Sequence, residues 1–293
     1  MMQQIKPFIW ETQGQASGKT ITIIGGTHGN ERTGIEVVLK LKSMIESGEL
    51  FLKTGTVYLI HGNPRAIEIS ERGSEPFLDL NRSFPISLLM NEPTGVYEDT
   101  RAREIAPILQ KSDIVVDLHA TNKPSEPFVA SMHSPYHEDV YRWFPCQKVL
   151  SDPNAVLAGE PVTTDEYTDA HGGIGLCYET GQASDLARVD EVTQNVLDLL
   201  VDQGLLEGEA VPPAICEHER YELTEPIILT DEGFTFAEGF GERSWESFMQ
   251  GTTLGHHGPA PFIVGYDGVI VFPKVPEHRK VGKPLAYLAK RVG

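Results

Sequence analysis

Short apolar runs alternate with helical patterns through the first two-thirds of the chain. The runs that predict strands are residues 20–24, 56–60, 114–116, 128–130 and 176–178. The patterns that predict amphipathic helices are residues 32–46, 99–110 and 186–199. Pro107 implies a kink in the second helix, and Ser184 or Asp185 is the expected N-cap of the third. This alternation predicts an α/β domain with a mixed or mostly parallel sheet flanked by helices.

The pattern changes at residues 204–213, which read as a linker. Beyond it the chain consists of short apolar runs broken by Gly and Pro, such as residues 227–229, 262–264 and 269–272. We therefore expect two domains, a larger one at residues 1–207 and a small β-rich one at residues 208–293.

Composition and charge exclude several classes of protein. Apolar residues make up 40% of the 293, which is enough for a sizeable core and argues against a disordered chain. The formal net charge is −18 and no block of Lys or Arg occurs, which argues against binding to nucleic acid or to anionic membranes.

The three cysteines, Cys146, Cys177 and Cys216, are widely spaced and form no CxxC pair, which makes a disulfide scaffold or a Cys-based zinc finger improbable. No apolar stretch is long enough to span a bilayer, and none near the N-terminus has the length of a signal peptide. We therefore expect a cytoplasmic protein. The sequence leaves open whether the chain forms homo-oligomers.

Two histidines and a glutamate stand after predicted strands. His28 and Glu31 lie three residues apart on the turn that follows residues 20–24, and His119 ends the run at 114–116. In α/β sheets functional sites gather at the carboxyl ends of the strands, and zinc favours this mix of nitrogen and oxygen ligands. Asp117 lies on the same face of its strand as His119 and could orient that imidazole. The alternatives are a solvated loop at 28–31 and a buried structural histidine at 119.

Other polar residues follow the remaining strands or lie in loops. Arg65, Asn81 and Arg82 hint at an anion pocket, because Arg binds carboxylates bidentately and Asn adds donors. Glu179 ends the run at 176–178 and could act as general base and acid beside a metal. Surface ion pairing is the alternative for each arginine taken alone.

Taken together in their order, these motifs resemble the succinylglutamate desuccinylase/aspartoacylase family of zinc carboxypeptidase-like hydrolases. The motifs that carry the resemblance are His28-Gly29-Asn30-Glu31, Asn63-Pro64-Arg65-Ala66, Asp79-Leu80-Asn81-Arg82, Asp117-Leu118-His119 and Glu179 before a glycine two residues later. The resemblance implies a zinc-carboxypeptidase-like mixed sheet with a small β-rich C-terminal domain, and one Zn²⁺ held by His28, Glu31 and His119. It implies that Glu179 is the catalytic carboxylate and that Arg65 polarises the scissile carbonyl. It also implies that Asn81 and Arg82 grip the substrate carboxylate.

The chain also departs from the family pattern. Residues 163–171 hold three acids and no arginine where aspartoacylases carry a further substrate-binding Arg, and no substrate-facing tyrosine is evident near residues 276–280. The acids favour a substrate with a cationic group, with His171 as a hydrogen-bonding partner, unless this loop points to solvent.

The function expected from these features is zinc-dependent hydrolysis of the amide of a small anionic or zwitterionic N-acyl amino acid. The products are a carboxylic acid and a free amino compound. Two alternatives stay open at this point: a metallocarboxypeptidase acting on peptides, and a non-catalytic metal-binding relative.

Overall fold

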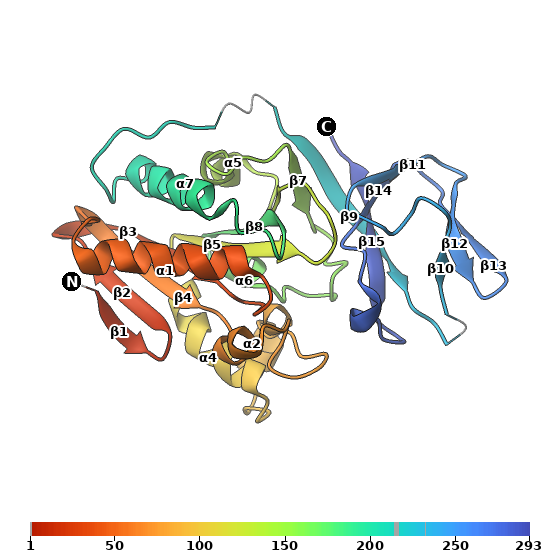
Figure 1. The fold of residues 1–293 in the computed structure, drawn as a ribbon, viewed down its shortest axis with the longest axis horizontal. Helices are drawn as coiled ribbons and strands as arrows, with labels where there is room; N and C mark the ends of the chain where they lie inside the picture. The colour runs from red at the N-terminus through yellow and green to blue at the C-terminus, as the bar shows by residue number, and fades with distance from the viewer. Residues whose placement is uncertain (1, 214–216, 232) are drawn as a thin grey trace.

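One large mixed sheet runs through the computed structural model, which describes residues 2–213, 217–231 and 233–293 (Figure 1). Its strands are β1 (Gln3–Lys6), β2 (Ile9–Gln13), β3 (Ala16–Gly25), β4 (Thr54–His61), β5 (Ile114–Thr121), β6 (Phe128–Ala130), β7 (Lys148–Ser151), β8 (Ile174–Gln182), β9 (Glu219–Ile228), β11 (Glu246–Phe248), β14 (Gly268–Val271) and β15 (Pro284–Arg291). Within the described residues they lie in the order β1-β2-β4-β3-β5-β8-β6-β7-β9-β15-β14-β11. A second sheet has the order β10-β12-β13 and comprises β10 (Thr235–Phe236), β12 (Thr253–His257) and β13 (Ala260–Ile263).

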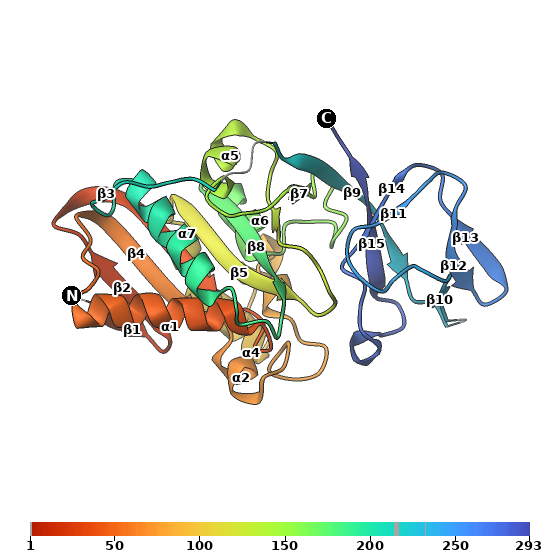
Figure 2. The ribbon, with the colours of Figure 1, turned by 45° about the horizontal axis from the view of Figure 1, so that its top comes forward.

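Helices cover both faces of the first part of the sheet. They are α1 (Arg32–Ser47), α2 (Pro64–Ile69), α3 (Ile86–Leu89), α4 (Tyr97–Leu109), α5 (Pro135–Tyr141), α6 (Thr164–Ala170) and α7 (Val189–Asp202), with 3₁₀ turns η1 (Leu80–Arg82) and η2 (Pro276–His278). Helices α1 and α7 lie side by side (Figure 2). Ile23 of β3 packs in the apolar cluster that α1 and α7 complete, whereas its neighbour Ile24 packs in the cluster that α4 completes. Because successive strand residues point to opposite faces, these two clusters are the two sides of one sheet.

The central strands β4, β3, β5 and β8 run parallel, which brings their carboxyl ends to the same edge. Every residue of β5 is buried. The predicted α/β architecture and the strands and helices expected from the sequence are confirmed. One local detail differs: α7 begins at Val189 rather than near Ser184 or Asp185. Asp185 instead accepts a hydrogen bond from the backbone of Ala187 in the preceding turn. Helix α4 includes Pro107, as expected, and ends at Leu109.

The C-terminal strands extend the same sheet. Strand β9 pairs in parallel with β7 and antiparallel with β15. A further apolar cluster, which includes Phe234, Leu254 and Ile270, lies among the C-terminal strands. The C-terminal region is therefore β-rich, as expected, but it shares a sheet with the rest. The division between residues 207 and 208 falls in the linker between α7 and β9 and stays a prediction.

No helix in the described ranges combines the length and the apolar character needed to cross a lipid bilayer. Cys146 and Cys177 are buried free thiols, and Cys216 lies outside the described residues. Burial raises the pKa of Cys146 to about 12, which makes it an unreactive core thiol.

Candidate active site

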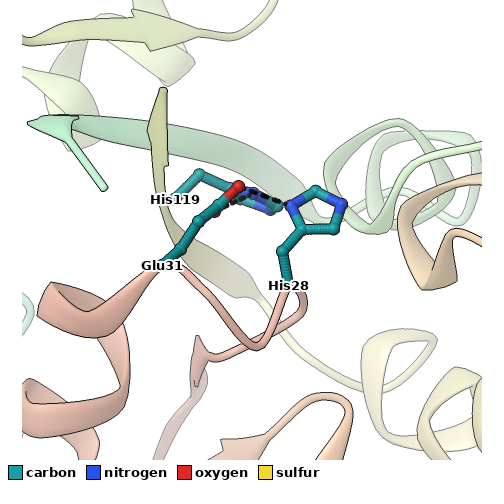
Figure 3. A group of neighbouring side chains, drawn as sticks. All are labelled: His28, Glu31 and His119. Atoms are coloured by element: carbon teal, nitrogen blue, oxygen red, sulfur yellow. Dashed lines mark hydrogen bonds and ion pairs between the residues drawn. The ribbon is translucent and has the colours of Figure 1, made fainter. Parts of the chain in front are cut away.

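Two histidines and a glutamate meet where β3 and β5 end (Figure 3). His28 and Glu31 lie in the loop from β3 to α1, and His119 comes from β5. The Glu31 carboxylate bridges them, with Oε1 2.7 Å from His28 Nδ1 and Oε2 3.0 Å from His119 Nδ1. Each of the three residues is 2% exposed. The structure thus brings the three predicted metal ligands together.

Glycines allow the loop that carries His28 and Glu31 to be tight. A Cβ at Gly25 would lie 2.1 Å from the carbonyl oxygen of Gly34 in α1, so a larger residue cannot fit there. Gly26 has φ +72°, a conformation that other residues rarely adopt. The end of β3 therefore packs directly on the first turn of α1, and Glu31 stands immediately before that helix.

A carboxylate supports each imidazole from behind. Asp79 Oδ1 lies 2.9 Å from His28 Nε2, and Asp117 Oδ2 lies 3.0 Å from His119 Nε2. The hydroxyls of Thr27 and Thr164 donate to Asp117 at 2.9 and 2.7 Å. A carboxylate that accepts the Nε2–H leaves Nδ1 as the free acceptor of a neutral imidazole. Both Nδ1 atoms face the Glu31 carboxylate, so all three donors point to one place.

Negative charge dominates this cluster. Burial disfavours the charges of Glu31 and Asp79, yet His28 and His119 lower the pKa of Glu31, and Arg72 and His28 hold that of Asp79 well below its usual range. Burial also disfavours a charged His119, but Asp117 and Glu31 raise its pKa well above the ordinary value. The cluster therefore attracts positive charge.

The donor set fits a divalent metal. Two imidazole nitrogens and a carboxylate oxygen, all within 4.8 Å of one another, form the His₂Glu set that zinc uses in hydrolytic sites. The buried carboxylates behind the imidazoles complete the arrangement that such sites share.

Replacing Asp79 by Asn is expected to weaken metal binding by about 10- to 100-fold, because His28 loses the carboxylate that fixes its tautomer. Competition with a chelator of known affinity measures the change. Asp190→Asn is a control, since its side chain is 89% exposed. Unchanged affinity in Asp79→Asn would show that Asp79 does not support a metal ligand.

Glu179 lies beside this cluster. It is the register partner of His119 on the neighbouring strand β8. It is 7% exposed, and its Oε2 has no hydrogen-bond partner within the described part of the chain. Burial, followed by the charge of Glu31, raises the pKa of Glu179 to about 8. A carboxyl group whose pKa is close to neutral pH is suited to proton transfer.

Cys177 lies two residues before Glu179 on the same strand, and its Sγ is within 4.8 Å of donor atoms of His119 and Glu179. Burial and then the charge of Glu179 raise the pKa of the Cys177 thiol well above its usual value. This side chain therefore behaves as an inert core thiol.

Asn81 and Arg82 reach the cluster through the turn η1. The Asp79 side chain accepts the Asn81 backbone N–H at 2.9 Å, and Asn81 Oδ1 accepts that of Thr164 at 3.1 Å. Asn81 Nδ2 lies 3.5 Å from His119 Nε2. Arg82 Nη1 donates to the Asn81 carbonyl at 2.7 Å. Burial raises the pKa of Tyr287 in β15, and the charge of Arg82 opposes that rise. Among described residues, Arg82 has no carboxylate within 4.0 Å.

The structure does not bring Arg65 to the cluster. Arg65 is exposed in the first turn of α2, where its guanidinium lies 4.1 Å from the ring centroid of Tyr97. Arg72 lies at the cluster instead: it donates to Asp79 Oδ2 at 2.9 Å and lies 3.7 Å from Glu31 Oε1. Close backbone packing explains why Arg65 stays outside the cluster. The Ala66 backbone of α2 packs directly on Gly29, in the loop that carries His28 and Glu31, while the Arg65 side chain extends to Tyr97 of α4.

The stretch at residues 163–171 contacts the cluster through Thr164, whereas two of its acids have partners elsewhere. Glu166 completes the capping box of α6 with Thr163, and Asp169 accepts from His137 Nε2 and the Gly175 backbone. His171 is exposed at the far end of α6, with Nδ1 2.7 Å from the Tyr167 carbonyl oxygen. Neither a cationic substrate group nor a role for His171 gains support from this arrangement.

Asp165 in this stretch is 7% exposed, and burial and then the charge of Glu166 raise its pKa to about 7. A carboxyl whose folded pKa exceeds its unfolded value destabilises the protein progressively as pH rises from about 4 to 7. Asp165→Asn is therefore expected to stabilise the fold by on the order of 3 kcal/mol at pH 8 and by little at pH 4.

Thermal unfolding of Asp165→Asn at both pH values measures this difference. Asp139→Asn is the matched control because the Asp139 side chain is 69% exposed. Equal shifts in melting temperature at pH 4 and pH 8 would contradict the expectation.

Sequence reasoning missed the residues that reach the cluster from elsewhere. Arg72 was not singled out, and Asp79 was part of a motif but was given no role. Their proximity in sequence to Asn81 and Arg82 is the signal that could have assigned them. Tyr287, Lys274 and His278 come from the C-terminal region, and no local pattern connects them to residues 28–31.

Comparison with known proteins identifies the family. The model of the succinylglutamate desuccinylase/aspartoacylase catalytic domain matches residues 17–205. The chain belongs to this family. Solved structures of the family share its fold: a succinylglutamate desuccinylase from Vibrio cholerae has a TM-score of 0.76 at 20% identity, and covers 97% of this chain and 85% of its own. One from Chromobacterium violaceum has a TM-score of 0.75 at 19% identity, covering 100% and 91%.

Curated members of the family carry several names. A probable aspartoacylase from Nostoc sp. is 41% identical over 107 residues, which cover 34% of this chain and 35% of the relative. The N-alpha-acetyl-L-2,4-diaminobutyric acid deacetylase of Halomonas elongata is 25% identical over 301 residues, covering 95% and 84%. The chain matches about a third of the length of the first of its curated relatives.

Proposed function

We propose that this protein is a zinc-dependent amidohydrolase that cleaves the amide bond of small N-acyl amino acids. The observation that carries the proposal is the buried His28-Glu31-His119 cluster with Glu179 beside it on the adjacent strand. Family members named as an aspartoacylase, a succinylglutamate desuccinylase and an N-acyl-aromatic-L-amino acid amidohydrolase support the reaction class.

The residues of the chain divide the chemistry between them. Zinc in such a site polarises the scissile carbonyl and lowers the pKa of water toward neutrality. Glu179 accepts a proton from the attacking water as the new C–O bond forms, and gives it to the departing nitrogen as the C–N bond breaks. The charge of His119 lowers the pKa of Glu179, and a bound cation would act in the same direction. Both favour the ionised carboxylate that accepts the proton.

Two arginines have separate tasks in this proposal. Arg72, beside Glu31 and Asp79, stabilises the negative charge that develops on the carbonyl oxygen. Arg82, with Asn81 next to it, holds a substrate carboxylate and so positions the amide. In the sequence-based hypothesis the first task belonged to Arg65, which lies outside the cluster.

A hydrolysis screen on zinc-loaded protein tests the function. The substrates are N-succinyl, N-acetyl and N-formyl amino acids with acidic, neutral and basic side chains, together with short peptides, and the readout is released amine. We expect turnover of N-acyl amino acids that a chelator removes and zinc restores, and none in His28→Ala. Release from peptides alone would instead favour a carboxypeptidase. No release from protein with one zinc bound per chain would overturn the enzymatic function.

A further inference from the structure

Four side chains with metal-binding donors stand on the adjacent strands β5 and β8. Asp117 is the register partner of Cys177, and His119 is that of Glu179. Residues two apart on a strand point to the same face, so the Cys177 thiol lies on the side of the sheet that carries Glu179. The Cys177 Sγ, a His119 ring nitrogen and a Glu179 carboxylate oxygen all lie within 4.8 Å of one another. These three side chains form a second group of donors beside the His-Glu-His cluster.

Two donors of this second group have no other partner that would compete with an ion. Glu179 is 7% exposed, and its Oε2 accepts no hydrogen bond from any residue that the structure describes. A buried oxygen without a partner is costly, and a bound ion is one way to satisfy it. Cys177 is 6% exposed and is a free thiol, so its sulfur is not held in a disulfide. A carboxylate oxygen and a sulfur are therefore both available.

The thiol determines which ions this second group prefers. The His28-Glu31-His119 cluster offers nitrogen and oxygen only, whereas the second group adds a sulfur, and thiolate ligands favour soft ions such as Cd²⁺. Burial and the charge of Glu179 keep the pKa of the Cys177 thiol high, which protects it from oxidation. A dication replaces the thiol proton, because a coordinating sulfur is deprotonated outright. The same side chain is thus inert alone and able to bind a soft dication.

The two groups of donors share His119 and compete for it. Asp117 Oδ2 lies 3.0 Å from His119 Nε2, so a neutral imidazole keeps its N–H there and has its single lone pair on Nδ1. One lone pair serves one ion at a time. An ion in the second group therefore takes a ligand from the zinc position and at the same time engages Glu179, the group that transfers the proton in the proposed reaction.

We propose that His119, Cys177 and Glu179 form an alternative site for a thiophilic divalent ion such as Cd²⁺, and that its occupation expels zinc and blocks the Glu179 carboxylate. This inference rests on the proposed zinc position and goes beyond it, because it gives the protein a site at which soft metal ions inactivate it reversibly. The Cys177 thiol loses one proton to solvent as the sulfur–cadmium bond forms, and regains it when a chelator removes the ion.

The test adds CdCl₂ to zinc-loaded protein and follows the ultraviolet charge-transfer band of a cadmium-bound thiolate together with the zinc released. Cys177→Ser removes the sulfur with little change in size, and Cys177→Ala repeats the comparison without a polar atom in the buried position. Glu179→Gln weakens a second donor and keeps the thiol. Cys146→Ser and Cys216→Ser are the matched controls, because each removes one of the other two cysteines of the chain.

We expect the wild type and both controls to gain the band and to release about one zinc per cadmium bound, because His119 serves one ion. Cys177→Ser and Cys177→Ala should lose the band and bind cadmium more weakly by over the roughly 10- to 100-fold that loss of a supporting residue costs at a metal site. Glu179→Gln should keep the band with weaker binding. Zinc release without a band, or a band of undiminished intensity in either Cys177 variant, would overturn the inference.

The band also separates this inference from the catalytic function, since its measurement needs no turnover. CdCl₂ added to metal-free protein should give the same band in the wild type and none in Cys177→Ser, even if no amide is cleaved. Absence of the band from metal-free wild-type protein counts against the site, whatever the hydrolysis screen shows.

Discussion

Glu179→Gln is expected to lower turnover of an N-acyl amino acid by about 10²- to 10⁴-fold while zinc stays bound, because the amide cannot take the proton that the carboxylate takes. The substitution keeps the size of a side chain that is 7% exposed, so the fold should be preserved. Elemental analysis measures the metal and steady-state kinetics the turnover.

The matched control is Glu207→Gln, whose carboxylate is 81% exposed in the linker. We expect this control to retain full activity. If Glu179→Gln kept near-normal turnover, proton transfer would have to be assigned to another group. Loss of zinc from the variant would instead assign Glu179 to metal binding. This outcome has to be tested because a Glu179 oxygen lies within 4.8 Å of a His119 nitrogen.

Arg72→Met should lower kcat/KM by about 10²- to 10³-fold, because a positioned cation facing the developing oxyanion is lost. Arg65→Met should change it little, since that guanidinium stacks on Tyr97 at the surface. Measuring the two variants side by side, with zinc content for each, separates the two candidates for carbonyl polarisation. The opposite ranking would return this role to Arg65.

A loss of zinc from Arg72→Met is the outcome that needs a second variant. Arg72 pairs with Asp79, which supports His28, so metal binding and oxyanion stabilisation are linked there. Arg72→Lys keeps the charge near Asp79 but loses the fork of donors. Retained zinc with low kcat in Arg72→Lys would support the catalytic task, and normal kcat would limit Arg72 to a supporting one.

The strands and helices of residues 1–207 could be predicted from the sequence because the hydrophobic pattern of each element lies within a short stretch of the chain. Apolar runs such as residues 114–116 are long and uniform enough to mark buried strands, and α1 has a clear apolar face. The predicted start of α7 is wrong because Ser and Asp side chains can cap a turn as readily as a helix. Asp185 accepts the Ala187 N–H in a turn that precedes Val189, where the helix begins.

Local rules also made His28, Glu31, His119 and Glu179 candidates, and the family resemblance gave them their roles. Each follows a predicted strand, and parallel strands bring their carboxyl ends to one edge, so residues distant in the chain meet there without knowledge of the loops. Asp117 follows from the same argument, because its place two residues before His119 fixes the face on which it lies.

By itself, then, the sequence determined the α/β class and the places of His28, Glu31, His119 and Glu179 after predicted strands, and its motifs, through the family resemblance, grouped them into one site. Only the tertiary structure decided that Arg72 meets the cluster while Arg65 does not, which partners the acids of α6 have, and that Tyr287 of β15 feels the charge of Arg82. The reason is that packing decides the direction of a long side chain on a loop. The path of β9 to β15 across the sheet is likewise set by pairing between strands 56 to 71 residues apart.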